Sequence, residues 1–182
     1  HFWQLPALGG PGEPILEAYT LLGALAARTT RVQLGTLVTG VTYRNPALLA
    51  KIVTTLDVVS HGRAILGIGA AWYDVEHQGY GFAFPGAGER LDRLEEAVQI
   101  CRAMLRGEEP TFAGRFYTTV QARNVPPPLQ PESIPIAAAT ASRERFMRGS
   151  PVKSVVNNWE IRTSPSSRSK RHHHRTRNRI AL

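Results

Sequence analysis

Apolar residues recur at helical spacing in three stretches of the chain, and each stretch predicts a helix. The first helix is expected over residues 14–28, after a loop at residues 2–13 that is rich in glycine and proline. The second is expected over residues 45–60, and the third is a long amphipathic helix over residues 87–106. Gly107 follows the third pattern directly, at the usual position of a glycine that ends a helix.

Shorter apolar runs stand between these helices and predict strands. Residues 31–37 alternate between apolar and polar side chains, as a half-buried strand does. Residues 64–68 are almost continuously apolar, which is typical of a strand buried on both faces, and residues 134–137 are expected to begin another. Residues 111–131 are interpreted as an excursion from the main fold. The alternation of helix and strand indicates a parallel α/β architecture.

The charge is distributed unevenly along the chain. Residues 1–140 hold 11 Lys or Arg against 12 Asp or Glu, whereas residues 141–182 hold 11 against 2. The same C-terminal stretch is rich in Ser, Arg, His and Asn, and its apolar residues are scattered. Such a stretch buries too little apolar surface to offset the entropy of ordering. We therefore expect a folded domain over residues 1–139 and a basic, disordered tail over residues 140–182.

The composition argues against several kinds of site. With Cys101 as the single cysteine, no intramolecular disulfide is possible, and a reducing, cytoplasmic setting fits best. No Cys/His cluster has metal-ligand spacing, so no metal site is expected. His61, at a helix end, and His77, assigned to a loop, are interpreted as structural. No apolar run approaches the roughly 20 residues that span a bilayer. Because the first residue is His1 and not Met, we expect a fragment or a processed chain.

Three stretches together resemble the luciferase-like monooxygenase family of flavin- and coenzyme F420-dependent oxidoreductases, and most of all its F420-dependent members. They are His1-Phe2, the run from Leu34 to Ala47, and the run from Gly62 to Trp72. Supporting matches lie at residues 88–96, 112–117 and 126–131. The resemblance runs from residue 1 to about residue 137, and the order and spacing of the motifs carry it.

The fold that this resemblance implies is a (β/α)8 TIM barrel. Such a barrel needs about 250 residues, so the chain is expected to be a partial barrel that is truncated at both ends. Where family members continue with a strand and a glycine-rich phosphate-binding loop, this chain continues with its basic tail. A frameshift or an assembly error near residue 138 is the simplest explanation of that change.

The resemblance also implies a cofactor site at the rim where the barrel strands end. The peptide between Leu37 and Val38 is expected to be a non-prolyl cis bond in a bulge that backs a flavin-type ring, with Thr39 beside it. The alternative is an ordinary strand end. Asn45 is expected either to contact the cofactor or to cap its helix, and the cap is favoured.

The second part of this site is expected at the end of the strand over residues 64–68. Gly67 and Gly69 would let the main chain approach the cofactor, with simple packing as the alternative for both, and Ala70 is expected to contact the cofactor beside them. Trp72 stands where related sugar-phosphate dehydrogenases have a glutamate, which favours a more apolar pocket wall. His1 is the candidate catalytic residue, because an imidazole near the ring can exchange a proton beside the hydride transfer.

The leading functional hypothesis is an oxidoreductase or monooxygenase that uses reduced F420, or alternatively FMN. It would pass hydride to a small organic substrate or oxygenate it, and its intact parent is expected to be a homodimer. The alternative is a nucleic-acid-binding protein that acts through the basic tail, which has charge but no recognised motif. A third hypothesis is an inactive partial barrel, since open strand edges and apolar helix faces destabilise such a chain.

Overall fold

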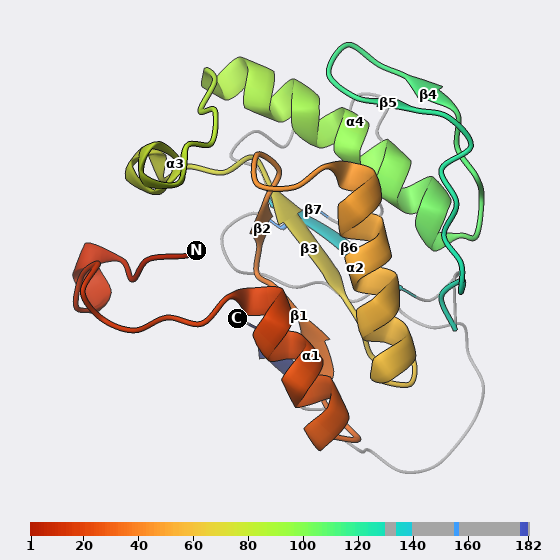
Figure 1. Cartoon of the computed structure of the whole chain (residues 1–182), viewed down its shortest axis with the longest axis horizontal. Helices are drawn as coiled ribbons and strands as arrows, with labels where there is room; N and C mark the ends of the chain where they lie inside the picture. Colours follow the sequence, from red (N-terminus) through yellow and green to blue (C-terminus); the bar gives the residue numbers. More distant parts are fainter. Residues whose placement is uncertain (130–133, 140–154, 157–178, 182) are drawn as a thin grey trace.

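Helices and strands alternate along the chain in the computed structural model, which describes residues 1–129, 134–139, 155–156 and 179–181 (Figure 1). The helices are the short 3-10 helix η1 (Pro6–Leu8), α1 (Ala18–Arg28), α2 (Pro46–Val59), α3 (Asp74–Tyr80) and α4 (Ala87–Leu105). The strands are β1 (Gln33–Gly35), β2 (Thr39–Gly40), β3 (Leu66–Gly69), β4 (Phe112–Ala113), β5 (Thr118–Thr119), β6 (Ile136–Ala139), β7 (Val155–Val156) and β8 (Arg179–Ala181).

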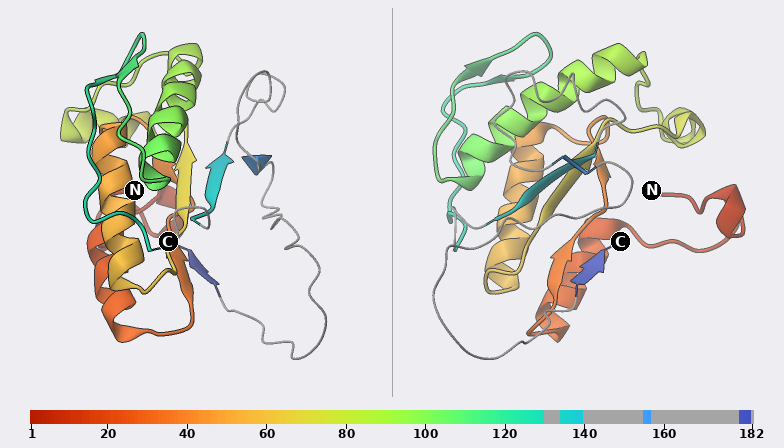
Figure 2. Two further views of the ribbon diagram at one scale, coloured as in Figure 1. Left: turned by 90° about the vertical axis from the view of Figure 1, so that its right-hand side faces the viewer. Right: turned by 180° about the vertical axis from the view of Figure 1, so that it is seen from behind.

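The central strands form a parallel sheet in the order β2-β3-β6-β7, and β1 pairs in parallel with β8. Helices α1, α2 and α4 cover one face of this sheet, as the left-hand view in Figure 2 shows. Helix α2 packs against both α1 and α4, and the buried side chains come from all three helices and from β3. The parallel α/β architecture predicted from the alternating pattern is confirmed.

The core between α2 and α4 explains the apolar stripes in the sequence. Leu49 and Val53 of α2 and Leu94 and Val98 of α4 are at most 1% exposed. Cys101 lies in the same layer, and its thiol donates to the Pro46 carbonyl at 3.3 Å. Burial raises the pKa of the Cys101 thiol to about 12, so it stays protonated and unreactive near neutral pH.

Strands β1 and β2 pair one after the other with the same neighbouring segment, residues 64–69, and a bulge separates them. Leu34 of β1 bridges to Ala64, and Thr39 of β2 pairs with Ile68 of β3. From Leu34 to Thr39 the chain advances five residues, whereas from Ala64 to Ile68 the paired segment advances four. The extra residue defines a β-bulge. The bulge contains the cis peptide bond between Leu37 and Val38. The cis bond that the family resemblance implied is therefore present.

A chain of hydroxyl groups holds the two ends of this bulge together. Thr36 Oγ1 donates to the Gly67 carbonyl at 3.2 Å, and it lies 2.7 Å from Thr39 Oγ1. Tyr19 Oη lies 2.6 Å from Thr39 Oγ1. Because each hydroxyl has one proton, Tyr19 must donate to Thr39 and Thr39 to Thr36. Burial raises the pKa of the Tyr19 phenol, which keeps this first donor protonated.

Arg63 connects α1, α2 and the strand that follows α1. Its guanidinium donates to the carbonyls of Ala26, Thr29, Val32 and Ser60 over 2.6–2.9 Å. It thus satisfies carbonyls at the end of α1, which helical hydrogen bonds leave without donors. A positive charge at this end also interacts favourably with the helix dipole.

The first helix begins later than the sequence pattern indicates. The predicted helix covered residues 14–28, but Glu17 has an extended backbone (φ −61°, ψ 128°) and acts as the N-cap. Its carboxylate accepts the N–H of Thr20 at 2.7 Å. Leu16 is 67% exposed, so no buried contact stabilises an additional helical turn before this cap. The predicted start at residue 14 is therefore wrong.

The other elements follow the predictions more closely. The helices expected over residues 45–60 and 87–106 are α2 and α4, and Gly107 has the positive φ of 77° that ends a helix. Strand β1 is shorter than the predicted 31–37 because the bulge interrupts it. The excursion at residues 111–131 contains the antiparallel hairpin β4–β5, which α4 anchors.

Most of the predicted tail, residues 140–182, lies outside the described residues. Two short strands from this stretch are described, β7 beside β6 and β8 beside β1. The expectation of a disordered or frameshifted tail therefore stays a prediction. Within the described residues, no helix combines the length and apolar character that crossing a bilayer requires.

We expect Gly67→Ala to destabilise the protein by about 2 kcal/mol, because its Cβ would collide with the Thr36 carbonyl oxygen in the bulge. The matched control is Gly23→Ala in α1, where a Cβ would meet nothing within 4 Å. That control should gain up to about 1 kcal/mol from helix propensity. Urea unfolding measures both changes. Equal stability of Gly67→Ala and the wild-type protein would contradict the packing that we describe.

We expect Arg63→Lys to lower the free energy of unfolding by about 2 kcal/mol or more. An ammonium group has a single donor atom and cannot reach carbonyls from three elements at once. Arg123→Lys is the control, since the Arg123 side chain is 73% exposed in its ion pair with Glu109. Chemical denaturation should leave that control within about 0.5 kcal/mol of wild type. A similarly small effect of Arg63→Lys would refute the connecting role.

Candidate active site

The carboxyl ends of β2 and β3 meet at one edge of the sheet, and several predicted site residues lie there. Gly40 of β2 pairs with Gly69 of β3, and the N–H of Val41 donates to the Gly69 carbonyl at 2.9 Å. A Cβ at Gly69 would lie 2.8 Å from Val38 Cγ2, so the Val38 side chain packs over this glycine. The fold therefore brings Val38, Thr39 and Gly69 together.

Two of the predicted cofactor contacts already have partners inside the protein. The Thr39 hydroxyl is part of the hydroxyl chain from Tyr19, and Thr39 is only 5% exposed. The carbonyl of Ala70 accepts a hydrogen bond from Arg90 Nε at 3.0 Å. Leu37 and Val38 are half-buried. Because Val38 packs over Gly69, the packing alternative for that glycine is observed. Contacts of Leu37, Val38, Thr39 and Ala70 with a cofactor remain predictions.

His1 and Trp72 lie against each other at the end of β3. The centroid of the His1 ring is 5.5 Å from the Trp72 ring and 5.7 Å from the Tyr73 ring, both in edge-on geometry. Trp72 is 63% exposed, so most of its aromatic surface is open to a ligand. The predicted catalytic residue and the predicted wall of the pocket are thus neighbours.

Glu76 of α3 is a completely buried carboxylate that holds the start of the chain. Its Oε1 accepts the main-chain N–H groups of Phe2 and of Trp3, the latter at 3.0 Å. Its Oε2 accepts the Tyr43 hydroxyl at 2.5 Å and lies 3.1 Å from His1 Nδ1. Burial, together with the hydrogen bond to Glu76, raises the pKa of Tyr43, which therefore stays a donor.

Glu76 was not predicted as a site residue because α3 was not predicted from the sequence. This helix has seven residues, which is too short for apolar periodicity to reveal it. Its capping signals were nevertheless present: Asp74 stands in the first turn, and Gly81 follows the last with a φ of 72°. Those signals predict a helix, but they do not predict that the carboxylate of Glu76 is buried.

His77 lies in α3 and is buried, so its assignment to a loop was wrong. Its Nδ1 donates to the Tyr73 carbonyl at 2.7 Å, and its Nε2 accepts the Thr42 hydroxyl at 2.6 Å. Both ring nitrogens are therefore satisfied within the protein, in agreement with a structural role. Among the described residues, no group of three or more His, Cys, Asp or Glu side chains is placed to hold a metal ion.

Aromatic side chains pack around the segment that carries His1. Phe2 lies 4.9 Å from Tyr43 and 4.8 Å from Tyr80, measured between ring centroids. The Trp3 ring covers Gly79, where a Cβ would collide with it. These contacts and the Glu76 carboxylate hold the segment against α3, which places the His1 ring at the rim.

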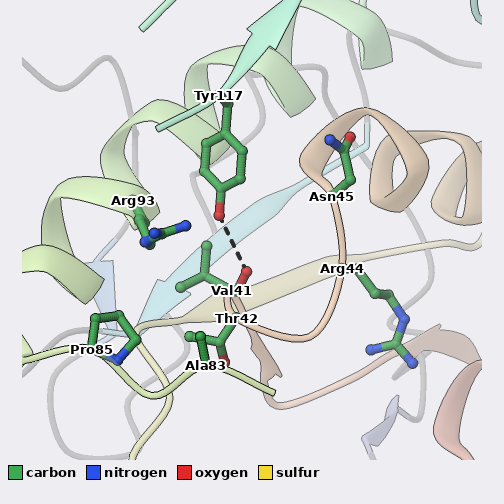
Figure 3. A pocket seen from close by; sticks show the side chains of 8 residues that line it. All are labelled: Val41, Thr42, Arg44, Asn45, Ala83, Pro85, Arg93 and Tyr117. Atoms are coloured by element: carbon green, nitrogen blue, oxygen red, sulfur yellow. Dashed lines mark hydrogen bonds between the residues drawn. The ribbon is translucent and has the colours of Figure 1, made fainter. Parts of the chain in front are cut away.

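Asn45 is a predicted site residue whose side chain has partners in its own helix. Its Oδ1 accepts the N–H of Ala47 at 2.9 Å, so the cap favoured in the sequence analysis is present. It also borders a cleft of about 270 Å³ (Figure 3). The cleft is lined by Val41, Thr42, Arg44, Asn45, Ala83, Pro85, Arg93 and Tyr117. His1, Val38, Gly69 and Trp72 do not line this cleft.

The two guanidinium groups at this cleft are already paired with carboxylates. Arg44 contacts Glu17 at 2.6 Å, and Arg93 contacts Glu89 at 2.7 Å. The cleft therefore offers little uncompensated charge to a ligand. The exposed rim around His1 and Trp72 is the better candidate for chemistry, although the cleft is the more enclosed space.

Comparison with known proteins agrees with this picture. The model of the family described as luciferase-like monooxygenase matches residues 1–148. The chain is 42% identical over 123 residues to an F420-dependent glucose-6-phosphate dehydrogenase of Kineococcus radiotolerans, a match that covers 67% of this chain and 36% of the relative. The chain thus spans less than half the length of the curated relatives that it matches.

Solved structures show the same relationship. Monooxygenase RslO1 from Streptomyces bottropensis is similar with a TM-score of 0.63 and 28% identity, over 76% of this chain and 40% of that one. An F420-dependent secondary alcohol dehydrogenase, solved with an F420-acetone adduct, gives 0.60 and 26%, over 69% and 38%. These likenesses confirm the expected partial α/β barrel. Since the family match covers most of its residues, the chain belongs to the luciferase-like monooxygenase family.

Proposed function

We propose that this chain is part of an F420-dependent oxidoreductase that acts on a small organic substrate. The observation that carries the proposal is the position of His1, in contact with Trp72 and hydrogen-bonded to the buried Glu76 at the end of β3. The relative of 42% identity is named as F420-dependent, which supports this cofactor. The likeness to a monooxygenase supports oxygenation as the alternative, and FMN is retained as the alternative cofactor through the family resemblance.

The residues at the rim fit a flat aromatic cofactor. Ala70 and Ala71 follow β3 with small, half-buried side chains, so no bulky group stands between a ligand and this turn. The exposed ring of Trp72 offers an aromatic surface beside them. We propose that Leu37 and Val38 of the bulge and Thr39 of β2 back the ring. Asn45 is retained as a cofactor contact only through the family resemblance, because its observed partners belong to its own helix.

His1 is proposed to move a proton beside the cofactor. A bound deazaflavin or flavin supplies the hydride chemistry, and the protein supplies orientation and proton transfer. With Nδ1 of His1 directed to the Glu76 carboxylate, Nε2 is the nitrogen that can accept or return a substrate proton. An imidazole suits this role because its ordinary pKa of ~6.5 lies close to neutral pH.

The aromatic wall formed by Trp72 and Tyr73 indicates which class of substrate the site would bind. Their ring centroids are 5.2 Å apart, and both rings contact His1. An aromatic wall favours an apolar organic group over a sugar phosphate, although the relative named above carries glucose 6-phosphate in its name. We therefore propose an apolar alcohol or carbonyl compound as the substrate class.

The competing hypotheses retain less support. Binding of nucleic acid would require the basic stretch of residues 141–182, most of which lies outside the described residues. A strongly salt-dependent affinity that is lost on deleting this stretch would favour that alternative. The expected homodimer and the cytoplasmic location also stay predictions.

Titration with F420 and, separately, with FMN tests the proposed function. Cofactor fluorescence should report saturable binding, with F420 binding more tightly than FMN. Trp72→Ala should weaken F420 binding about tenfold, since one aromatic contact contributes about 1 kcal/mol or slightly more. Val120→Ala is the control, because that side chain is 76% exposed in the hairpin region. If the wild-type chain bound neither cofactor, the proposal would fail.

A further inference from the structure

We propose that Glu76 is the positioning residue of His1: its buried carboxylate accepts the Nδ1 proton of His1 and so keeps the lone pair of the neutral imidazole on Nε2. This role rests on the proposed function, because the tautomer of His1 matters for the reaction only if Nε2 of His1 transfers a proton. It concerns a residue of α3 that lies outside the stretches that pointed to the cofactor site.

Glu76 is a buried carboxylate that several hydrogen-bond donors surround. Its side chain is 0% exposed, and a buried ionised carboxylate is strongly disfavoured unless donors surround it. All four donors come from distant parts of the chain: His1, Phe2 and Trp3 at the start, and Tyr43 after β2. The carboxylate therefore acts mainly to join the first residues to the rim, and it does not cap its own helix.

The hydrogen bonds at Glu76 all have the carboxylate as the acceptor. An ionised carboxylate has acceptors and no donor, so every group that contacts it must supply the proton. His1 Nδ1, at 3.1 Å from Oε2, must then carry hydrogen. In the neutral imidazole only one nitrogen carries hydrogen, which leaves Nε2 as the acceptor.

The backbone and the ring of His1 are both held in place. The main-chain N–H groups of Phe2 and Trp3 bind Oε1, so the backbone next to His1 is held by the same carboxylate as its ring. Trp72 and Tyr73 also contact the ring edge-on. Apart from the amino group of His1 itself, Glu76 is the charged group that the described residues place against this ring. The side chain is thus restricted in both position and tautomer.

His77 does not offer a competing partner for the carboxylate. Its ring stacks on Tyr43 at 4.4 Å between centroids, but its Nδ1 is directed to the Tyr73 carbonyl. Tyr43 donates to Glu76 and lies between the carboxylate and His77. His77 therefore does not compete with His1 for Oε2 of Glu76, which also accepts the Tyr43 hydroxyl.

The test is ¹⁵N NMR of the histidine side chains in the full chain, at a pH above the ordinary imidazole pKa of ~6.5. His1→Gln removes one of the six histidine signals and thereby assigns His1. The wild-type protein should show His1 protonated at Nδ1. In Glu76→Gln the amide group can donate toward His1 Nδ1, so the proton should move to Nε2.

Glu96→Gln is the matched control. Glu96 is also a carboxylate that accepts several main-chain N–H groups, those of Arg115, Phe116 and Tyr117 at 2.7–3.0 Å, but it holds the hairpin. This variant should leave the His1 tautomer as in wild type. A wild-type His1 protonated at Nε2 would overturn the proposal even if Glu76→Gln did not fold, and so would an unchanged tautomer in folded Glu76→Gln.

The NMR result separates this inference from the proposed function. The tautomer is measured without cofactor, so a wild-type chain that binds neither F420 nor FMN would leave the positioning role of Glu76 intact. Conversely, a chain that binds F420 but shows His1 protonated at Nε2 would refute only the role of Glu76. Either outcome is decided by its own measurement.

Discussion

The structure depends on the close contact between the bulge after β1 and strand β3. The carbonyl of Thr36 occupies the space that a side chain at position 67 would need, so only glycine fits there. The extra residue of the bulge turns the chain before β2 begins, and β2 then continues beside β3. The pairing of β2 with β3, whose carboxyl ends form part of the rim, therefore depends on this contact.

Buried polar groups then hold the elements around that contact. The hydroxyl chain from Tyr19 spans the bulge, and Arg63 joins the end of α1 to α2 and to the segment before β1. The hydroxyl chain reaches from Tyr19 to Gly67, and Arg63 reaches back to Ala26, so each includes partners from distant parts of the sequence. Because a buried polar group without a partner costs free energy, such networks favour one arrangement of the elements over alternatives.

The rim and the start of the chain are connected through Tyr43. A Cβ at Gly40 would lie 3.0 Å from the Tyr43 ring, so that ring packs directly on β2. The Tyr43 hydroxyl reaches Glu76, which in turn holds His1. The position of the candidate catalytic imidazole is therefore linked to the bulge through two side chains, and α3 contributes the residue that completes the link.

What the sequence by itself determined was local or carried by motifs. The Asn45 cap, the amphipathic pattern of α4 and Gly107 after it each depend on neighbouring residues, and all three are present as predicted. The family resemblance supplied the barrel and the cis bond at Leu37, since neither follows from periodicity. Tertiary structure alone decided that Glu76 is buried and which atoms face His1. Those features depend on contacts between residues more than 70 positions apart, which no local pattern of side chains encodes.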